Sequence, residues 1–425
     1  MMMKHAHIHG IQISEEKREK YMKRLKLSTR LLQAMLLFPF LVFWATIVAS
    51  LEQTPLTGRW RTIFLSPEEE DDIAAQLIGP GWYNAVHQVL SEEGEPKFIP
   101  PTDWRYQWVR ETLQRLVAVL PILEDERHQA PNWVEVGPDD RPLPPPARYP
   151  LKPRPRAVDY IRLVCHKLGV TQSPRPSDSD HFALLLVDSP VDSNAFSYGF
   201  WPNGGSGIVV YSGFLDDIFA KTPLQYVTPP DDRSWLSQFL GVPPPQPYPV
   251  VNEEQTTDLA VLLAHELSHL ILCHHLESLS SSSIVVPGTI SIIADIVRVL
   301  VFPITMFFGP FVNDAVAKMG DVGSGELRRM GEWCTTAKQE VEADVVSARI
   351  LAYAGFDARD AVKFWENRSD SDPECHRVER DRAAHLKTHR IRGVGHPENA
   401  RRIEVLKQEL SSWEKARLAA AAARA

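Results

Sequence analysis

The chain has 425 residues, of which 44% are hydrophobic and 24% are charged, values that are ordinary for a globular protein. This length allows two or three domains, or one large domain with appendages. The formal net charge of −8 argues against a general nucleic-acid-binding protein. The 4 cysteines are far apart and form no CxxC pair, which argues against both a disulfide framework and a cysteine zinc site.

An apolar stretch over residues 31–50, LLQAMLLFPFLVFWATIVAS, follows a basic N-terminal segment, residues 1–30. A helix of this length reaches about 30 Å, the thickness of a bilayer core. Pro39 is tolerated in a membrane helix, so we predict a transmembrane helix here. Because basic residues precede it and the acidic sequence PEEEDD (67–72) follows, the N-terminus should stay on the side of synthesis while the rest of the chain crosses.

Two other interpretations compete with a membrane span at residues 31–50. A cleaved signal peptide would have a shorter apolar core, nearer the start, with small residues at a cleavage site. A buried helix of a soluble domain would normally show a polar face, and this stretch has almost none.

The 34 prolines concentrate in residues 131–155 and 223–249. Because proline can continue neither a helix nor a central strand, we predict a linker in the first stretch and a long surface loop in the second. The predicted organisation is a helical region with a proline-rich linker over residues 51–155, a larger domain over residues 156–412 and an alanine-rich tail over residues 413–425.

The sequence LLAHELSHLILCHH (263–276) places His265 and His269 one turn apart on one face of a predicted helix. We expect this helix to begin near residues 256–258 and to be buried, because apolar residues fill most of its surface. Two imidazoles at this spacing can bind one Zn²⁺, and Glu266 is placed to act as general base on a metal-bound water. Ordinary buried histidines are commoner than ligands, but burying two histidines and an acid in one turn without a metal would be costly.

A second apolar stretch covers residues 284–311 and contains Asp295, Arg298 and Pro303. The internal charges and the proline weaken the case for a plain membrane span. A second span, a re-entrant hairpin, an amphipathic segment on the membrane surface and a core helix within the protein all remain open.

A catalytic zinc site has three protein ligands and one open position, so we expect a third ligand further along the sequence. In KQEVEADVVSARILAYAGFD (338–357), Glu340 and Asp344 share one helix face. Glu340 can supply the ligand, and Asp344 can accept the free ring N–H of a ligating histidine. The alternative is an exposed acidic helix start, which suits an N-terminal turn.

A later stretch, RIRGVGHPENARRIEVLKQEL (390–410), contains His396 at the end of a glycine-containing loop and Arg402 near the start of a predicted helix. If both side chains lie next to a zinc site, they could stabilise the oxyanion of a tetrahedral intermediate. A helix-start histidine and a solvent-facing arginine are the equally weighted alternative.

The HExxH motif at residues 265–269 and the ExxAD motif at residues 340–344, about seventy residues apart with an apolar insert, resemble the integral-membrane gluzincin peptidases. That group includes the bacterial heat-stress peptidase HtpX and the type-one CAAX prenyl protease.

Further stretches resemble one subgroup, that of the mitochondrial inner-membrane peptidase whose activity overlaps with the m-AAA protease. They are PLTGRWR (55–61), NAFSYGFWPNGGSGIVVYSGFL (194–215), His274, Glu277 and GHPENARRIEVL (395–406).

The resemblance, which covers about residues 50–410, implies a mainly helical α+β fold with a small sheet and one Zn²⁺ per chain. It places His396 and Arg402 on matching positions of the subgroup's motif. It further implies an edge strand that binds an extended substrate through main-chain hydrogen bonds, formed by Ile208, Val209, Val210 and Tyr211.

The resulting hypothesis is a membrane-anchored zinc metalloendopeptidase with His265, His269 and Glu340 as ligands. It would cleave membrane proteins or peptides at the bilayer, in quality control and stress response at the mitochondrial inner membrane, with its peptidase domain facing the intermembrane space. A homo-oligomer is possible, and no nucleic-acid partner is expected.

Two rival hypotheses remain. One is an inactive membrane scaffold or chaperone-like protein with a structural zinc, which would need a fourth protein ligand. Cys273, His274 and His275 are near in sequence, but a helix would direct them away from the His265–His269 face or one turn beyond it. The other is a CAAX-type protease of the endoplasmic reticulum, whose relatives need a cage of several spans.

Overall fold

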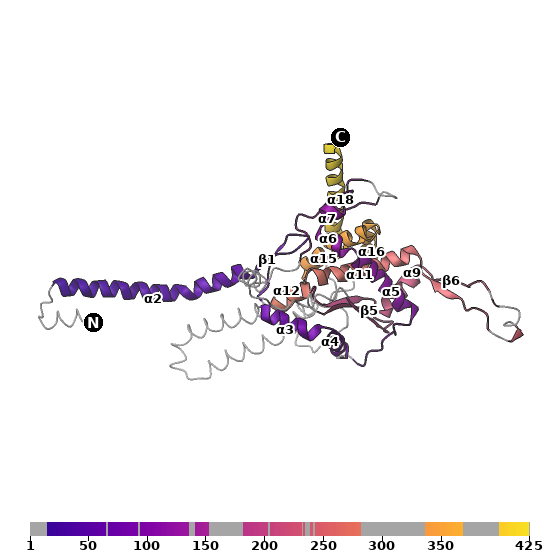
Figure 1. Ribbon diagram of the computed structural model, residues 1–425, viewed down its shortest axis with the longest axis horizontal. Helices are drawn as coiled ribbons and strands as arrows, with labels where there is room; N and C mark the ends of the chain where they lie inside the picture. The colour runs from indigo at the N-terminus through magenta and orange to yellow at the C-terminus, as the bar shows by residue number, and fades with distance from the viewer. Residues whose placement is uncertain are drawn as a thin grey trace, which may run out of the picture. The chain divides into compact units, whose positions relative to one another are not determined.

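The computed structural model describes residues 15–64, 67–91, 94–135, 141–152, 182–202, 205–231, 233, 239–240, 243–281, 336–368 and 399–424. Its helices and strands (Figure 1) are α2 (Glu15–Ser50), β1 (Leu51–Gln53), β2 (Trp60–Thr62), α3 (Pro67–Leu77), α4 (Pro80–Ser91), α5 (Trp104–Val117), α6 (Leu120–Glu124), α7 (Glu126–Gln129), β3 (Ala183–Val187), β4 (Ala195–Gly199), β5 (Ser206–Tyr211), α9 (Ser212–Lys221), β6 (Gln225–Val227), β7 (Tyr248–Val250), α11 (Glu253–Ile271), α12 (His274–Ser280), α15 (Ala337–Tyr353), α16 (Ala358–Asn367) and α18 (Asn399–Arg424). These elements confirm a mainly helical α+β protein with small sheets.

The chain divides into two compact units, Met1–Glu52 and Gln53–Ala425. The first contains α2, a helix of 36 residues that includes the predicted span at residues 31–50. Large apolar side chains along this helix are exposed, among them Met35 at 74% and Leu41 at 66%. By length and hydropathy, no single helix within the described residues qualifies as a membrane span, although the bent pair α11 and α12 does by length and composition.

Helix α11 is the central element of the second unit. It begins after Asn252, whose side chain accepts a hydrogen bond from the Gln255 N–H at 2.8 Å while the Gln255 side chain accepts one from the Asn252 N–H at 2.8 Å. This capping box starts the helix a few residues before the expected position at 256–258. Helix α15 begins in the same way, after Thr336.

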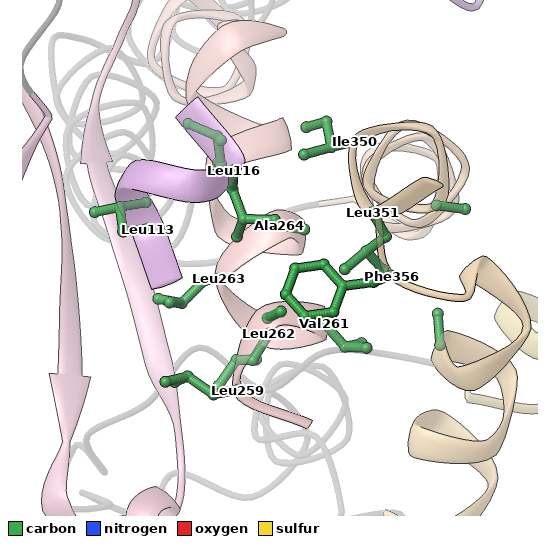
Figure 2. Close-up of a cluster of buried hydrophobic side chains, with 14 of the residues drawn as sticks. Leu113, Leu116, Leu259, Val261, Leu262, Leu263, Ala264, Ile350, Leu351 and Phe356 are labelled. Carbon is green, nitrogen blue, oxygen red and sulfur yellow. The ribbon is translucent and has the colours of Figure 1, made fainter. Parts of the chain in front are cut away.

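The hydrophobic core gathers around α11 (Figure 2). Leu113 and Leu116 of α5 lie on one side of it, and Leu351 of α15 and Phe356 lie on the other. All of these side chains are buried. Because α11 is apolar over most of its surface, this packing leaves its histidines inside the protein, where only paired or ligating polar groups are stable.

The three-stranded sheet corrects one prediction. Its strand order is β3–β5–β4, so Ile208, Val209, Val210 and Tyr211 lie on the central strand and not on an edge. β5 pairs in parallel with β3 and antiparallel with β4, and all four side chains are buried. A continuous apolar run is typical of a strand that is covered on both sides, which the resemblance to a hairpin did not reveal.

The proline-rich segments differ from each other. β6 and β7 pair antiparallel and close the ends of the predicted surface loop. In the predicted linker, by contrast, Leu151 is buried and its N–H donates to the Leu123 carbonyl at 2.9 Å, and the Pro145 carbonyl accepts from Arg349 at 2.8 Å. The described part of this segment is therefore packed within the second unit.

Candidate metal centre

His265, His269 and Glu340 meet where α11 packs against α15. Nε2 of His265 lies 3.1 Å from Nε2 of His269 and 3.2 Å from Oε2 of Glu340, and Nε2 of His269 lies 3.5 Å from Oε1 of Glu340. All three side chains are buried, and one ligand atom of each lies within 4.8 Å of the other two.

This donor set fits zinc. Ligand atoms about 2.0–2.1 Å from a tetrahedral ion are about 3.3 Å from one another, which is close to the spacing of these three groups. Two imidazoles and one carboxylate are also the protein ligands of a catalytic zinc site with one open position. Within the described residues, the group of side chains able to hold a metal does not include His274 or His275.

Asp344 lies against the ring of the first histidine. Its Oδ1 lies 2.9 Å from Nδ1 of His265, so the imidazole proton is placed on Nδ1 and Nε2 is left for the metal. Burial alone would lower the pKa of His265, but Asp344 and then Glu340 raise it to about 9. This distance is compatible with the role that the sequence predicted for Asp344, which stays a prediction.

Arg402 of α18 supports the two carboxylates. Its Nε and Nη2 donate to Asp344 at 2.7 and 2.8 Å, and its Nη1 lies 3.5 Å from Oε2 of Glu340. The guanidinium is buried and lies 4.0 Å from the ring centre of Trp365. Burial would lower the pKa of Arg402, yet Asp344 raises it, so the side chain stays charged. These contacts make Arg402 a positioning group, while its predicted oxyanion contact stays a prediction.

The second histidine has a different neighbour, which sequence reasoning missed. Nδ1 of His269 lies 2.9 Å from Nδ1 of His274, whose Nε2 lies 3.1 Å from Oε2 of Glu342. The sequence placed His274 away from the His265–His269 face or one turn beyond it, and did not predict this contact, which forms because α11 ends at Ile271. Cys273 adopts a left-handed conformation with φ 56°, and α12 departs at an angle of 50°.

Glu266 is also held by side chains that the sequence did not single out. The Ser197 hydroxyl, on β4, donates to Oε2 of Glu266 at 2.8 Å and lies 3.0 Å from Nε2 of His275. Burial lowers the pKa of His275 to about 4, so this imidazole is neutral at physiological pH. Ser197 belongs to the stretch NAFSYG, whose resemblance to known peptidases was the available signal.

Comparison with known families decides what kind of protein carries this centre. Residues 160–410 match peptidase family M48. The chain belongs to peptidase family M48. Members of M48 are zinc-dependent metallopeptidases, and the cluster of His265, His269 and Glu340 lies inside the matched region. Among curated proteins, no sequence match was found.

Two parts of the predicted M48 machinery lie outside the described residues. These are His396 and the apolar stretch over residues 284–311. The structure brings together Glu266, the three predicted ligands and Asp344, with Arg402 beside them.

Proposed function

We propose that this M48 member is a membrane-anchored zinc metalloendopeptidase that cleaves membrane proteins, in quality control at the mitochondrial inner membrane. The observation that carries the catalytic part is the buried triangle of His265, His269 and Glu340, with Glu266 on the same turn of α11. Three protein ligands are the number found in catalytic zinc sites, whose fourth position is taken by water or substrate.

The chain's own groups divide the work of peptide hydrolysis. Zinc, when bound by the triangle, supplies a Lewis acid that polarises the scissile carbonyl and acidifies water. Glu266 takes a proton from the attacking water and later passes it to the leaving amine. Ser197 and His275 keep the Glu266 carboxylate oriented for both transfers. Asp344 and Arg402 maintain the ligand geometry.

We propose β4 as the substrate-binding strand in place of β5. β4 is an edge strand of the described sheet, and its Ser197 contacts Glu266 directly. A peptide that pairs with β4 through main-chain hydrogen bonds would therefore lie beside the general base. Such pairing gives affinity with little side-chain selectivity, which suits a peptidase with several substrates.

The membrane part of the proposal is supported by the helix α2. It is long, it includes the apolar stretch over residues 31–50, and its large apolar side chains are exposed. A lipid bilayer is the environment that would cover such side chains. The mitochondrial location is supported by the subgroup resemblance of the segments at residues 55–61 and 194–215.

Glu266→Gln tests the catalytic proposal. This variant should bind one zinc per chain and cleave an unfolded substrate such as β-casein about 10²–10⁴-fold more slowly, because the general base is lost. Glu254→Gln is the matched control, since Glu254 is an exposed residue in the first turn of the same helix. Cleavage by the Glu266 variant at the wild-type rate would contradict the assignment of Glu266 as general base.

A further inference from the structure

A directional chain of hydrogen bonds leads away from the metal centre through the second histidine. For Nε2 of His269 to bind a metal, its proton must sit on Nδ1, which then donates to Nδ1 of His274 at 2.9 Å. The proton of His274 must in turn sit on Nε2, which donates to Oε2 of Glu342 at 3.1 Å. Each donor therefore meets an acceptor only if His269 is in its metal-binding tautomer.

The far end of this series of hydrogen bonds lies in the segment PLTGRWR (55–61), which the proposed mechanism does not use. The Thr57 hydroxyl donates to Oε1 of Glu342, and Nε of Arg59 donates to its Oε2 at 2.7 Å. The other two nitrogens of Arg59 donate to both carboxylate oxygens of Glu277 at 2.8 and 2.7 Å. Arg59 thus uses its whole planar fork to hold two carboxylates.

The two metal-binding histidines are therefore supported unequally. His265 is held by Asp344 directly, whereas His269 reaches its carboxylate, Glu342, through a second imidazole. Helix α11 ends at Ile271 and α12 begins at His274. The break between these two helices directs the His274 ring back toward His269. Glu342 and the ligand Glu340 lie on the same helix, α15, so this helix supplies both a ligand and the carboxylate that supports His269 through His274.

We propose that His274, Glu342 and Arg59 form a positioning relay that holds His269 in the tautomer and orientation that bind the metal. This inference rests on the proposed function only in taking His269 as a metal ligand. It gives the segment at residues 55–61 a role in the metal site, although it is more than two hundred residues away in the sequence.

Glu342→Gln in the full-length chain tests the relay, because it removes the negative charge of the carboxylate that accepts hydrogen bonds from His274 and Arg59. Zinc affinity, measured by competition with a chromophoric chelator, should fall about 10–100-fold, as is typical for partners behind a metal ligand. The visible absorption bands of the Co²⁺-substituted protein should shift as well, since they report ligand geometry without any substrate.

Glu126→Gln is the matched control. Glu126 is buried and pairs with Arg349, whose Nη1 lies 2.9 Å from its Oε1, so the substitution removes the same charge from another buried pair of the same unit. The control should lower the melting temperature while leaving zinc affinity and the Co²⁺ spectrum unchanged. Equal loss of zinc affinity in both variants, or an unchanged affinity and spectrum in Glu342→Gln, would overturn the relay.

Arg59→Lys keeps the test decisive if Glu342→Gln does not fold. Lysine keeps the charge but cannot form the fork, so the Co²⁺ spectrum should shift in a protein that stays folded by circular dichroism. An unshifted spectrum would count against the relay. A wild-type chain that binds zinc and cleaves nothing would contradict the peptidase proposal and leave the relay intact.

Discussion

At the scale of single residues, the two metal-binding histidines differ in their readiness to lose a proton. Burial opposes the charge on both, but Asp344 raises the pKa of His265 to about 9, whereas burial keeps the pKa of His269 well below its ordinary value. At neutral pH the metal-free centre therefore holds a charged imidazole next to a neutral one. The charged ring must give up a proton before it can bind a cation.

Zinc affinity should consequently rise with pH. Below about pH 9 the metal displaces a proton from His265, so the affinity should increase about tenfold per pH unit between about pH 6 and 8 and level off above about pH 9. Chelator competition at several pH values measures this. Asp344→Asn removes the carboxylate that raises the pKa and should shift the plateau to lower pH. An affinity that is flat across this range in the wild type would refute the assignment.

At the scale of elements, the turn before β2 depends on one glycine. Gly58 has φ +73°, and a Cβ placed there would overlap the ring of Tyr149. Its N–H donates to the Thr54 carbonyl at 2.9 Å, which closes the turn from Thr54 to Gly58. A side chain at this position would be disfavoured both by the backbone conformation and by the lack of space.

Gly58→Ala should therefore lower the free energy of unfolding by about 1–3 kcal/mol, measured by urea denaturation. Gly79→Ala is a suitable control, because Gly79 has φ +59° but a Cβ placed there would meet no atom within 4 Å. The control isolates the cost of the backbone conformation, about 1 kcal/mol. If the two variants lost the same stability, steric overlap with Tyr149 would not contribute.

The sequence predicted the elements that local patterns specify. The one-turn spacing of His265 and His269 requires only a regular helix, and the same is true of Glu340 and Asp344, so these residues could be named before the structure. The position of Glu340 beside the histidines also needed tertiary packing, for which the order of the motifs was the only signal.

The structural features that the sequence did not predict depend on irregular backbone conformation or on contacts between distant segments. Cys273 adopts a left-handed backbone conformation that is more typical of glycine or asparagine, so the sequence did not predict it. This conformation turns His274 toward His269. Strand order is a property of the sheet, so β5 could be recognised as a strand but not as the central one. Ser197 reaches Glu266 only because β4 packs against α11.

At the scale of the whole molecule, the second unit brings distant segments to one buried centre. Arg59, Ser197 and Arg402 lie far apart in the sequence, yet each makes a hydrogen bond to a side chain of α11, α12 or α15. The first unit, α2, contributes none of the described groups of the centre. The proposal that this helix anchors the chain in a membrane can therefore be tested apart from the chemistry.

The full-length chain, synthesised into membrane vesicles, should resist extraction with alkaline carbonate if residues 31–50 form the proposed span. A tag after Ala425 should be protected from protease added on the side of the N-terminus, as the basic segment before the helix requires. The double variant Leu37→Arg, Leu41→Arg is the control. Each arginine at the helix centre raises the free energy of membrane insertion by about 2.5–3.5 kcal/mol, so this variant should be extracted. Extraction of the wild type would exclude the span, and digestion of its tag would reverse the orientation.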